Sequence, residues 1–173
     1  MTQGTHHAAD DPRNHDILIY VNGELRPRTQ AVVSVFDSGF ILGDGVWEGL
    51  RVHRGRIAFL GAHLDRLYEA AKAIDLDVGL DRAGLTKALY QTLAANGMTE
   101  GVHMRLMVTR GLKSTPYQDP RAGIGPATVV IIPEYKLPRP ELLTLGVRLF
   151  TVHVRRGAPD VLDPKLNSHS KLN

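Results

Sequence analysis

The stretch from Gly39 to Arg56, which reads GFILGDGVWEGLRVHRGR, constrains the fold more than any other part of the chain. Its bend at Gly43-Asp44-Gly45 tolerates positive φ angles and lets the backbone pass close to a ligand or another strand. The residues from Gly45 to His53 favour an extended strand, and Arg54-Gly55 then turns the chain into a second short strand. The sequence therefore predicts a strand pair that is entered through a tight, glycine-rich bend.

Two charged residues, Glu48 and Arg51, lie inside this otherwise apolar strand. Burying a charge without a partner is costly. One interpretation places both side chains on a solvated face of the strand. The other is that Arg51 binds a fixed anion such as a phosphate, because a guanidinium donates two parallel hydrogen bonds to such a group.

The rest of the chain alternates between helical and strand patterns. Apolar residues recur three and four positions apart from Leu60 to Ile74, which predicts a helix. A second helix is expected from Asp81, a suitable N-cap, to Asn96-Gly97, a suitable stop. The first strand pattern ends in the hairpin signal Asn22-Gly23. The strand patterns cover residues 16–21, 31–36, 102–109, 127–132 and 146–154, and together with the helices they predict an α/β fold.

A proline-rich segment indicates a division into two domains. Residues 133–140 contain three prolines, which favours a semi-rigid connector over a helix or strand. We therefore expect a small N-terminal α/β domain over residues 16–132 and the incomplete start of a larger, cofactor-binding domain over residues 141–173. The polar residues 1–15 show no periodicity and are expected to form a mobile arm.

Composition and charge argue against several classes of function. The 21 basic and 18 acidic residues are interspersed, so no nucleic-acid partner is expected. The chain has no cysteine, which removes disulfides, thiolate catalysis and cysteine-ligated zinc. His6 and His7 have no third ligand nearby, so no metal site is expected. No apolar run approaches the length of a membrane span and no signal peptide is evident, so we expect a cytoplasmic protein without a membrane partner.

The run Asp44–Arg51, followed by Leu60, His63, Leu64, Arg66 and Leu67, resembles the N-terminal signature of the class IV (fold type IV) pyridoxal-phosphate aminotransferases. That family includes branched-chain aminotransferases, D-amino acid aminotransferases and aminodeoxychorismate lyase. The resemblance extends from Tyr20–Gly23 through Val108–Gly111 to the lysine-bearing end of the chain. It implies a two-domain fold type IV enzyme with pyridoxal 5'-phosphate as cofactor and a site completed in a homodimer.

The resemblance also implies roles for individual residues. In the family, a lysine just before a helix forms the Schiff base with the cofactor. The spacing favours Lys165, because the next helix would then begin near Asn167, and Lys171 is the alternative. The freed amine would move a proton between substrate Cα and the cofactor. Arg51 would anchor the cofactor phosphate.

The residues that would contact the substrate are also implied by resemblance. Phe40 and Trp47 would shape an apolar pocket, and Phe40 stands where D-amino acid aminotransferases carry a tyrosine. Those enzymes have an arginine shortly after the Thr-Arg-Gly of the long loop, where this chain has Lys113. Arg110, Lys113 or Arg121 could neutralise a substrate carboxylate.

The resulting hypothesis is a class IV aminotransferase. It would exchange an amino group between a branched-chain or other apolar L- or D-amino acid and a 2-oxo acid by a ping-pong mechanism. One alternative is a lyase of the same family that acts on aminodeoxychorismate. Another is a non-catalytic fragment or binding module, because members of the family are considerably longer.

Overall fold

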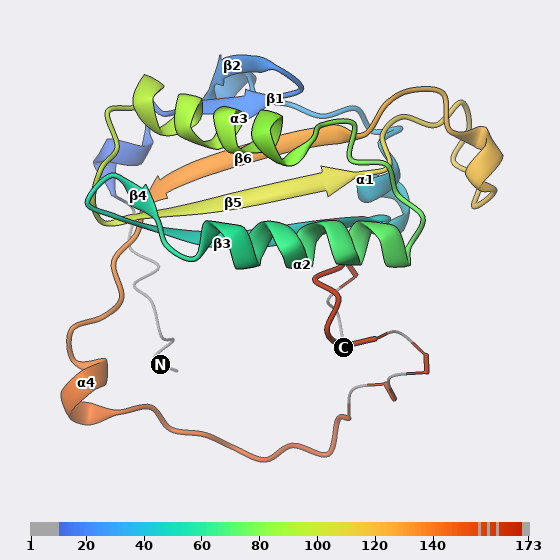
Figure 1. Ribbon diagram of the computed structural model, residues 1–173. Coiled ribbons are helices and arrows are strands. Elements are labelled where there is room, and N and C mark those ends of the chain that lie inside the picture. The colour runs from blue at the N-terminus through green and yellow to red at the C-terminus, as the bar shows by residue number, and fades with distance from the viewer. Residues whose placement is uncertain (1–10, 156, 159, 162, 171–173) are drawn as a thin grey trace.

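The computed structural model describes residues 11–170 apart from 156, 159 and 162. Six strands form one sheet in the order β2-β1-β6-β5-β3-β4, and all neighbouring strands are antiparallel. Helices α2 (Leu60–Ala73) and α3 (Arg82–Ala95) lie side by side over one face of the sheet (Figure 1). The structure therefore confirms the expected mixed α/β class. The strands are β1 (Leu18–Val21), β2 (Glu24–Pro27), β3 (Gly45–His53), β4 (Arg56–Ile57), β5 (Val102–Thr109) and β6 (Thr128–Tyr135).

Both predicted long helices are confirmed to within a residue or two. The Asp81 side chain accepts a hydrogen bond from Gly84 N at 2.7 Å and so caps α3 as expected. Short helices fill the connections. They are the α-helices α1 (Ser38–Leu42) and α4 (Leu142–Leu145) and the 3-10 helices η1 (Pro12–Asn14), η2 (Arg28–Gln30) and η3 (Pro120–Ala122).

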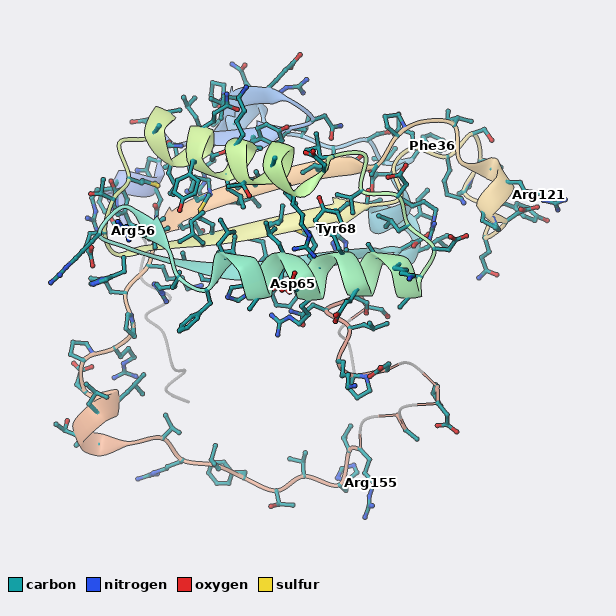
Figure 2. The ribbon with its side chains drawn as sticks, in the orientation of Figure 1. Phe36, Arg56, Asp65, Tyr68, Arg121 and Arg155 are labelled. Carbon is teal, nitrogen blue, oxygen red and sulfur yellow. The ribbon has the colours of Figure 1, made fainter. Side chains whose placement is uncertain are left out.

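The hydrophobic core lies between the two long helices and the sheet. Each helix turns its leucines toward the strands, whose alternate residues point back at them. Figure 2 shows Tyr68 on the side of α2 that faces α3, and its hydroxyl donates to Leu80 O at 2.6 Å. The most deeply buried core residues include Leu64, Leu67, Leu85, Leu89, Val46, Leu50, Met104, Leu106 and Ile131.

The β1–β2 hairpin forms at the predicted turn. Asn22 and Gly23 both have positive φ, 50° and 96°, and Val21 pairs with Glu24 across the turn. The Asn22 side chain also accepts a hydrogen bond from Val129 N at 2.7 Å. The turn therefore fixes the hairpin and attaches it to the first residues of β6.

Strand β6 continues through Pro133 to Tyr135, three residues into the segment that we expected to be a connector. Val129 and Tyr135 direct their backbone groups toward β1 and Asn14, away from β5. Pro133 is separated from Val129 and Tyr135 by an even number of positions, so its nitrogen also points away from β5. The pairing of β6 with β5 therefore needs no N–H from Pro133. The facing Leu18 bonds instead to the side chain of Asn96, through its N–H at 2.7 Å and its C=O at 2.9 Å.

Two predicted strands do not form. Residues 31–36 are irregular and largely exposed, and residues 146–154 contain no strand in the structure as described. A strand is stable only when a neighbour satisfies its backbone groups. Both segments have the apolar composition of a strand but lack such a neighbour within the described part of the chain.

Residues 11–15 also differ from the expected mobile arm. Asn14 is buried, and its side chain exchanges two hydrogen bonds with the backbone of Tyr135, at 2.8 and 3.1 Å. Arg13 stacks on the Tyr135 ring, 4.0 Å from its centroid. The chain is therefore attached to the sheet from η1 onward, and the expected arm before residue 11 lies outside the described residues.

Candidate functional site

Strand β3 points its two charged side chains to opposite faces of the sheet. Glu48 faces the helices and is fully buried, whereas Arg51 is half-buried on the other face. The interpretation that placed both on one solvated face is therefore wrong. A period of two along a strand requires that residues 48 and 51 diverge in this way.

Glu48 is held by two residues of α2. Its carboxylate accepts hydrogen bonds from Arg66 Nε at 2.7 Å and Arg66 Nη2 at 2.6 Å. The Nδ1 atom of His63 lies 2.8 Å from Oε2 of the same carboxylate. This hydrogen bonding raises the pKa of the Arg66 guanidinium above its usual value. A buried carboxylate with two such partners ties α2 to the strand that carries Arg51.

The sheet face opposite α2 and α3, here called the open face, carries three rows of half-buried side chains. They follow from the registers of β3 with β5 and of β5 with β6. The rows are Trp47, Met107 and Val130; Gly49, Arg105 and Ile132; and Arg51, His103 and Glu134. The open face is therefore apolar at the end that carries Trp47 and polar at the end that carries Arg51, with Arg105 and Ile132 between them.

Arg51 has the contacts expected of an anion-binding residue. Its Nη1 donates to the carbonyl oxygen of Lys136, and within the described residues no carboxylate lies within ion-pair distance of its guanidinium. The His103 ring leans over Gly49 beside it, because a Cβ at Gly49 would lie 3.0 Å from His103 Nε2. The remaining Arg51 donors are therefore available for a phosphate or carboxylate.

Trp47 lies at the edge of the open face and contacts the last described segment of the chain. Arg105 stacks on its ring, 4.0 Å from the centroid. Its indole N–H donates to Ser168 O at 3.0 Å and its backbone N–H to Asn167 O at 2.8 Å. The sheet edge at β3 is thus extended by a segment more than a hundred residues away in sequence.

Lys165 lies two residues before this pairing. The helix that we expected to begin near Asn167 is wrong for the described residues 167–170, which bond to β3 as an extended segment instead. Its side chain is exposed, and its backbone N–H donates to the Asp163 carboxylate at 2.9 Å in a turn. The alternative lysine, Lys171, lies outside the described residues. The structure therefore brings the Lys165 turn to the same strand that carries Trp47 and Arg51.

The other predicted substrate residues are not gathered on the open face. Phe40 is 71% exposed on α1. Arg110 pairs with Asp44 at 2.7 Å and also donates to the carbonyls of Ile74 and Asp75, so it is occupied by structural contacts. Lys113 is buried and donates to Asp119 O at 2.9 Å within the long loop.

Arg121 is the remaining candidate for a substrate carboxylate. It projects from that loop beyond the end of the sheet (Figure 2) and pairs with Asp119 at 2.6 Å. Arg105 and His103 were not predicted as site residues from the sequence. Their alternation with apolar residues in the strand over residues 102–109 was the available signal.

His169 adds a titratable group to this edge. Its ring Nε2 lies 3.1 Å from Val46 O, and burial lowers its pKa below the usual 6.5. The nearby Asp37 and Asp44 act in the opposite direction, and Arg105 acts with the burial. The folded protein therefore binds this proton less readily than the unfolded chain does.

This difference predicts a loss of stability in acid. A histidine whose pKa is lowered by folding costs no stability above pH 6.5, and destabilises the folded state as the pH falls below that value. We expect the melting temperature of the wild type to fall more between pH 7.5 and 5.5 than that of His169→Gln. Thermal denaturation followed by circular dichroism measures both slopes. Equal slopes would show that His169 is not buried as a neutral ring.

The described residues contain no group of three or more histidines and carboxylates placed to hold a metal ion. No helix among them is long and apolar enough to cross a bilayer.

The fold and the site together define a mixed α/β domain whose open face presents Arg51 without a carboxylate partner among the described residues. The family model for class IV aminotransferases (Amino-transferase class IV) matches residues 45–173, a span that includes β3 and the Lys165 turn. The chain therefore belongs to the class IV aminotransferase family.

Individual relatives agree with this assignment. The chain is 40% identical over 162 residues to branched-chain-amino-acid aminotransferase-like protein 1 of Arabidopsis thaliana, covering 94% of this chain and 29% of that protein. It is also 40% identical to a putative branched-chain-amino-acid aminotransferase of Methanocaldococcus jannaschii, covering 90% of this chain and 52% of that one. The chain thus spans about half or less of these relatives.

Solved structures share the fold. The branched-chain aminotransferase of Thermoproteus uzoniensis, solved with norvaline, matches with a TM-score of 0.73 and 27% identity, covering 89% of this chain and 52% of that one. The 4-amino-4-deoxychorismate lyase of Pseudomonas aeruginosa matches with a TM-score of 0.56 and 34% identity, covering 72% of this chain and 41% of that one.

Proposed function

We propose that this chain belongs to a pyridoxal-phosphate-dependent aminotransferase that moves an amino group between an amino acid and a 2-oxo acid. The observation that carries the proposal is Arg51, a half-buried guanidinium without a carboxylate partner among the described residues, on a strand within the family match. A partly buried guanidinium without an acid favours an anion, which would accept hydrogen bonds from its remaining donors.

The residues present fit the cofactor by the chemistry of their donor groups. Arg51 offers a planar fork of N–H donors, which suits a phosphate dianion. Lys165 offers an exposed primary amine, which suits an aldehyde. When bound, the cofactor supplies an electron sink for the negative charge that develops at the substrate Cα.

The roles of the chain's own residues follow from this assignment. Arg51 would bind and orient the phosphate, while the buried Glu48 keeps its strand fixed against α2. Lys165 would hold the cofactor through its ε-amine and, once displaced by the substrate, would move the proton at substrate Cα. A ping-pong exchange needs no further group for this proton transfer, because the same amine serves both half-reactions.

An apolar donor side chain is the substrate class that the open face favours. Trp47, Met107, Val130 and Ile132 form an apolar surface beside the arginines. The names of the two relatives, both branched-chain aminotransferase types, agree with a branched-chain donor. Arg105 is paired in the sheet between Gly49 and Ile132 on this face, whereas Arg110, Lys113 and Arg121 lie outside the paired strands, so we assign the substrate carboxylate to Arg105.

A second candidate is an aminodeoxychorismate lyase-like activity. It is favoured by the 34% identity to the Pseudomonas aeruginosa lyase. Both activities would use Arg51 and Lys165. The two activities are distinguished by their products. The aminotransferase would release a 2-oxo acid from a branched-chain amino acid, and the lyase would release an aromatic amine from aminodeoxychorismate.

We also propose that the protein is a cytoplasmic homodimer, and that a small domain, extended to the end of β6 at Tyr135, precedes a larger cofactor-binding domain. Support for a subunit interface comes from a run of exposed apolar residues between η2 and β3. Its members are Val32, Val33, Val35, Phe36 and Phe40, each at least 44% exposed.

The cofactor assignment is tested by reduction with borohydride. We expect purified protein incubated with pyridoxal phosphate to be yellow, and reduction to leave a pyridoxyl group on the peptide that contains Lys165. Lys165→Ala should lose the label and the visible band, whereas Lys72→Ala, on α2, should keep both. A label on Lys171 would move the role to that residue. A colourless protein that binds no pyridoxal phosphate would favour the non-catalytic alternative.

A further inference from the structure

We propose that Trp47 is a positioning residue that holds the turn carrying Lys165 against β3. The importance of this turn rests on the proposed function, because that function makes Lys165 the reactive residue. The contact itself is independent of the cofactor and can be measured without it.

Strand β3 has a free edge near its first residues. Strand β4 pairs only with Val52 and His53, at the far end of β3. The edge near Gly45 would otherwise leave backbone donors and acceptors unpaired. Ser168 forms a bridge with Val46, and His169 N donates to Gly45 O at 2.9 Å. The segment over residues 167–169 therefore occupies the vacant strand position.

Trp47 adds a side-chain donor to this backbone pairing. It donates to two successive carbonyls, Asn167 O from its backbone at 2.8 Å and Ser168 O from its indole at 3.0 Å. Arg105 stacks on the ring and fixes its plane. A ring held in this way fixes the register of residues 167–169 along β3. Backbone pairing alone would allow this segment to shift along the strand.

A short hydrogen-bonded turn connects this contact to Lys165. Leu166 packs against the core, and its N–H donates to Asp163 O at 3.0 Å. The Asp163 carboxylate accepts from Lys165 N at 2.9 Å. Lys165 thus sits in a closed turn that is anchored two residues later by Trp47. A reactive side chain needs neighbouring contacts of this kind to hold it in the position from which it reacts.

The experiment compares Trp47→Phe with wild type by limited proteolysis with endoproteinase Lys-C. The variant keeps an aromatic ring for Arg105 and the backbone N–H, and it loses the indole N–H. The Lys165–Leu166 bond can be cut when the turn leaves β3, so its cleavage rate reports the undocked population. Loss of one hydrogen bond should raise that rate roughly 2- to 12-fold.

Two comparisons make the result specific. Cleavage at Lys136–Leu137 in the same protein should not change, since general loosening would accelerate both bonds. Tyr117→Phe removes one polar group from an aromatic side chain on the exposed loop and should cleave like wild type. Cleavage of Trp47→Phe at the wild-type rate, or equal acceleration at both lysines, would overturn the proposal.

A second measurement covers the case in which Trp47→Phe fails to fold. Trp47 is the single tryptophan of the chain, so its fluorescence reports this contact directly. His169→Pro removes the N–H that bonds to Gly45 O and should shift the emission to longer wavelength and increase acrylamide quenching. His169→Ala keeps that N–H and should change both less. Unchanged emission in His169→Pro would overturn the docking.

The pyridoxyl label then separates this inference from the proposed function. Faster cleavage with reduced labelling of Lys165 supports both. Faster cleavage in a protein that takes up no label in any variant supports the positioning of the turn and contradicts the cofactor assignment.

Discussion

Replacing Arg66 by methionine is expected to lower the free energy of unfolding by about 3 kcal/mol. The substitution keeps the apolar bulk on α2 and leaves Glu48, which has no exposed surface, with His63 as its one partner among the residues described here. A buried charge that loses a partner is strongly destabilising. The expected value lies at the low end of the usual range because Arg66 is itself 48% exposed. Urea denaturation followed by circular dichroism measures the difference.

The matched control is Arg82→Met on α3. Arg82 pairs with Asp65 at 2.6 Å, but both side chains are more than half exposed. Such a surface pair contributes at most about 1 kcal/mol. If the two variants lost similar stability, the burial of Glu48 would not depend on Arg66.

Replacing Gly111 by alanine is the second change with a large expected effect. Gly111 has φ +86°, and a Cβ there would lie 2.0 Å from the backbone oxygen of Pro126. The left-handed conformation costs about 1–2 kcal/mol for an alanine, and a clash with backbone adds about 1–3 kcal/mol because no side chain can move away. We expect a loss of about 2–5 kcal/mol in the same denaturation experiment.

Gly23→Ala separates the two contributions. Gly23 has a similar φ of +96°, but nothing lies within 4 Å of a Cβ at that position. It should lose only the conformational part, about 1–2 kcal/mol. Equal losses in the two variants would mean that the loop at Pro126 yields to the added methyl group.

The sequence predicted the elements whose signals are local. The helix over residues 60–73 follows from apolar spacing, the start of α3 from the cap at Asp81, and the β1–β2 hairpin from Asn22-Gly23. Residues 31–36 were wrongly predicted to form a strand, because their composition favours one while strand pairing depends on neighbours distant in sequence. The opposite error arose at Pro133, where β6 continues because the side chain of Asn96 bonds to Leu18, the residue opposite the proline.

The candidate site was predictable in part. The role of Arg51 was inferred from residue type and resemblance and stays a prediction; the structure places the residue, half-buried, on the open face. The grouping of Arg51, His103 and Glu134 depends on two strand registers, which no local pattern specifies. The contact of Trp47 with Asn167 and Ser168 could not be predicted for the same reason. The indole of Trp47 bonds to Ser168, which lies 121 positions later in the sequence.

The order of the strands has a consequence for how this domain folds during synthesis. Strand β6 is the last of the six to leave the ribosome, yet it lies between β1 and β5 in the middle of the sheet. Until it arrives, the β1–β2 hairpin and the β3–β5 pair each present an unsatisfied edge to other chains. Long-range pairing of this kind is slow and exposes nascent chains to aggregation. The newly made protein is therefore expected to need protection by a chaperone until residue 135 has emerged.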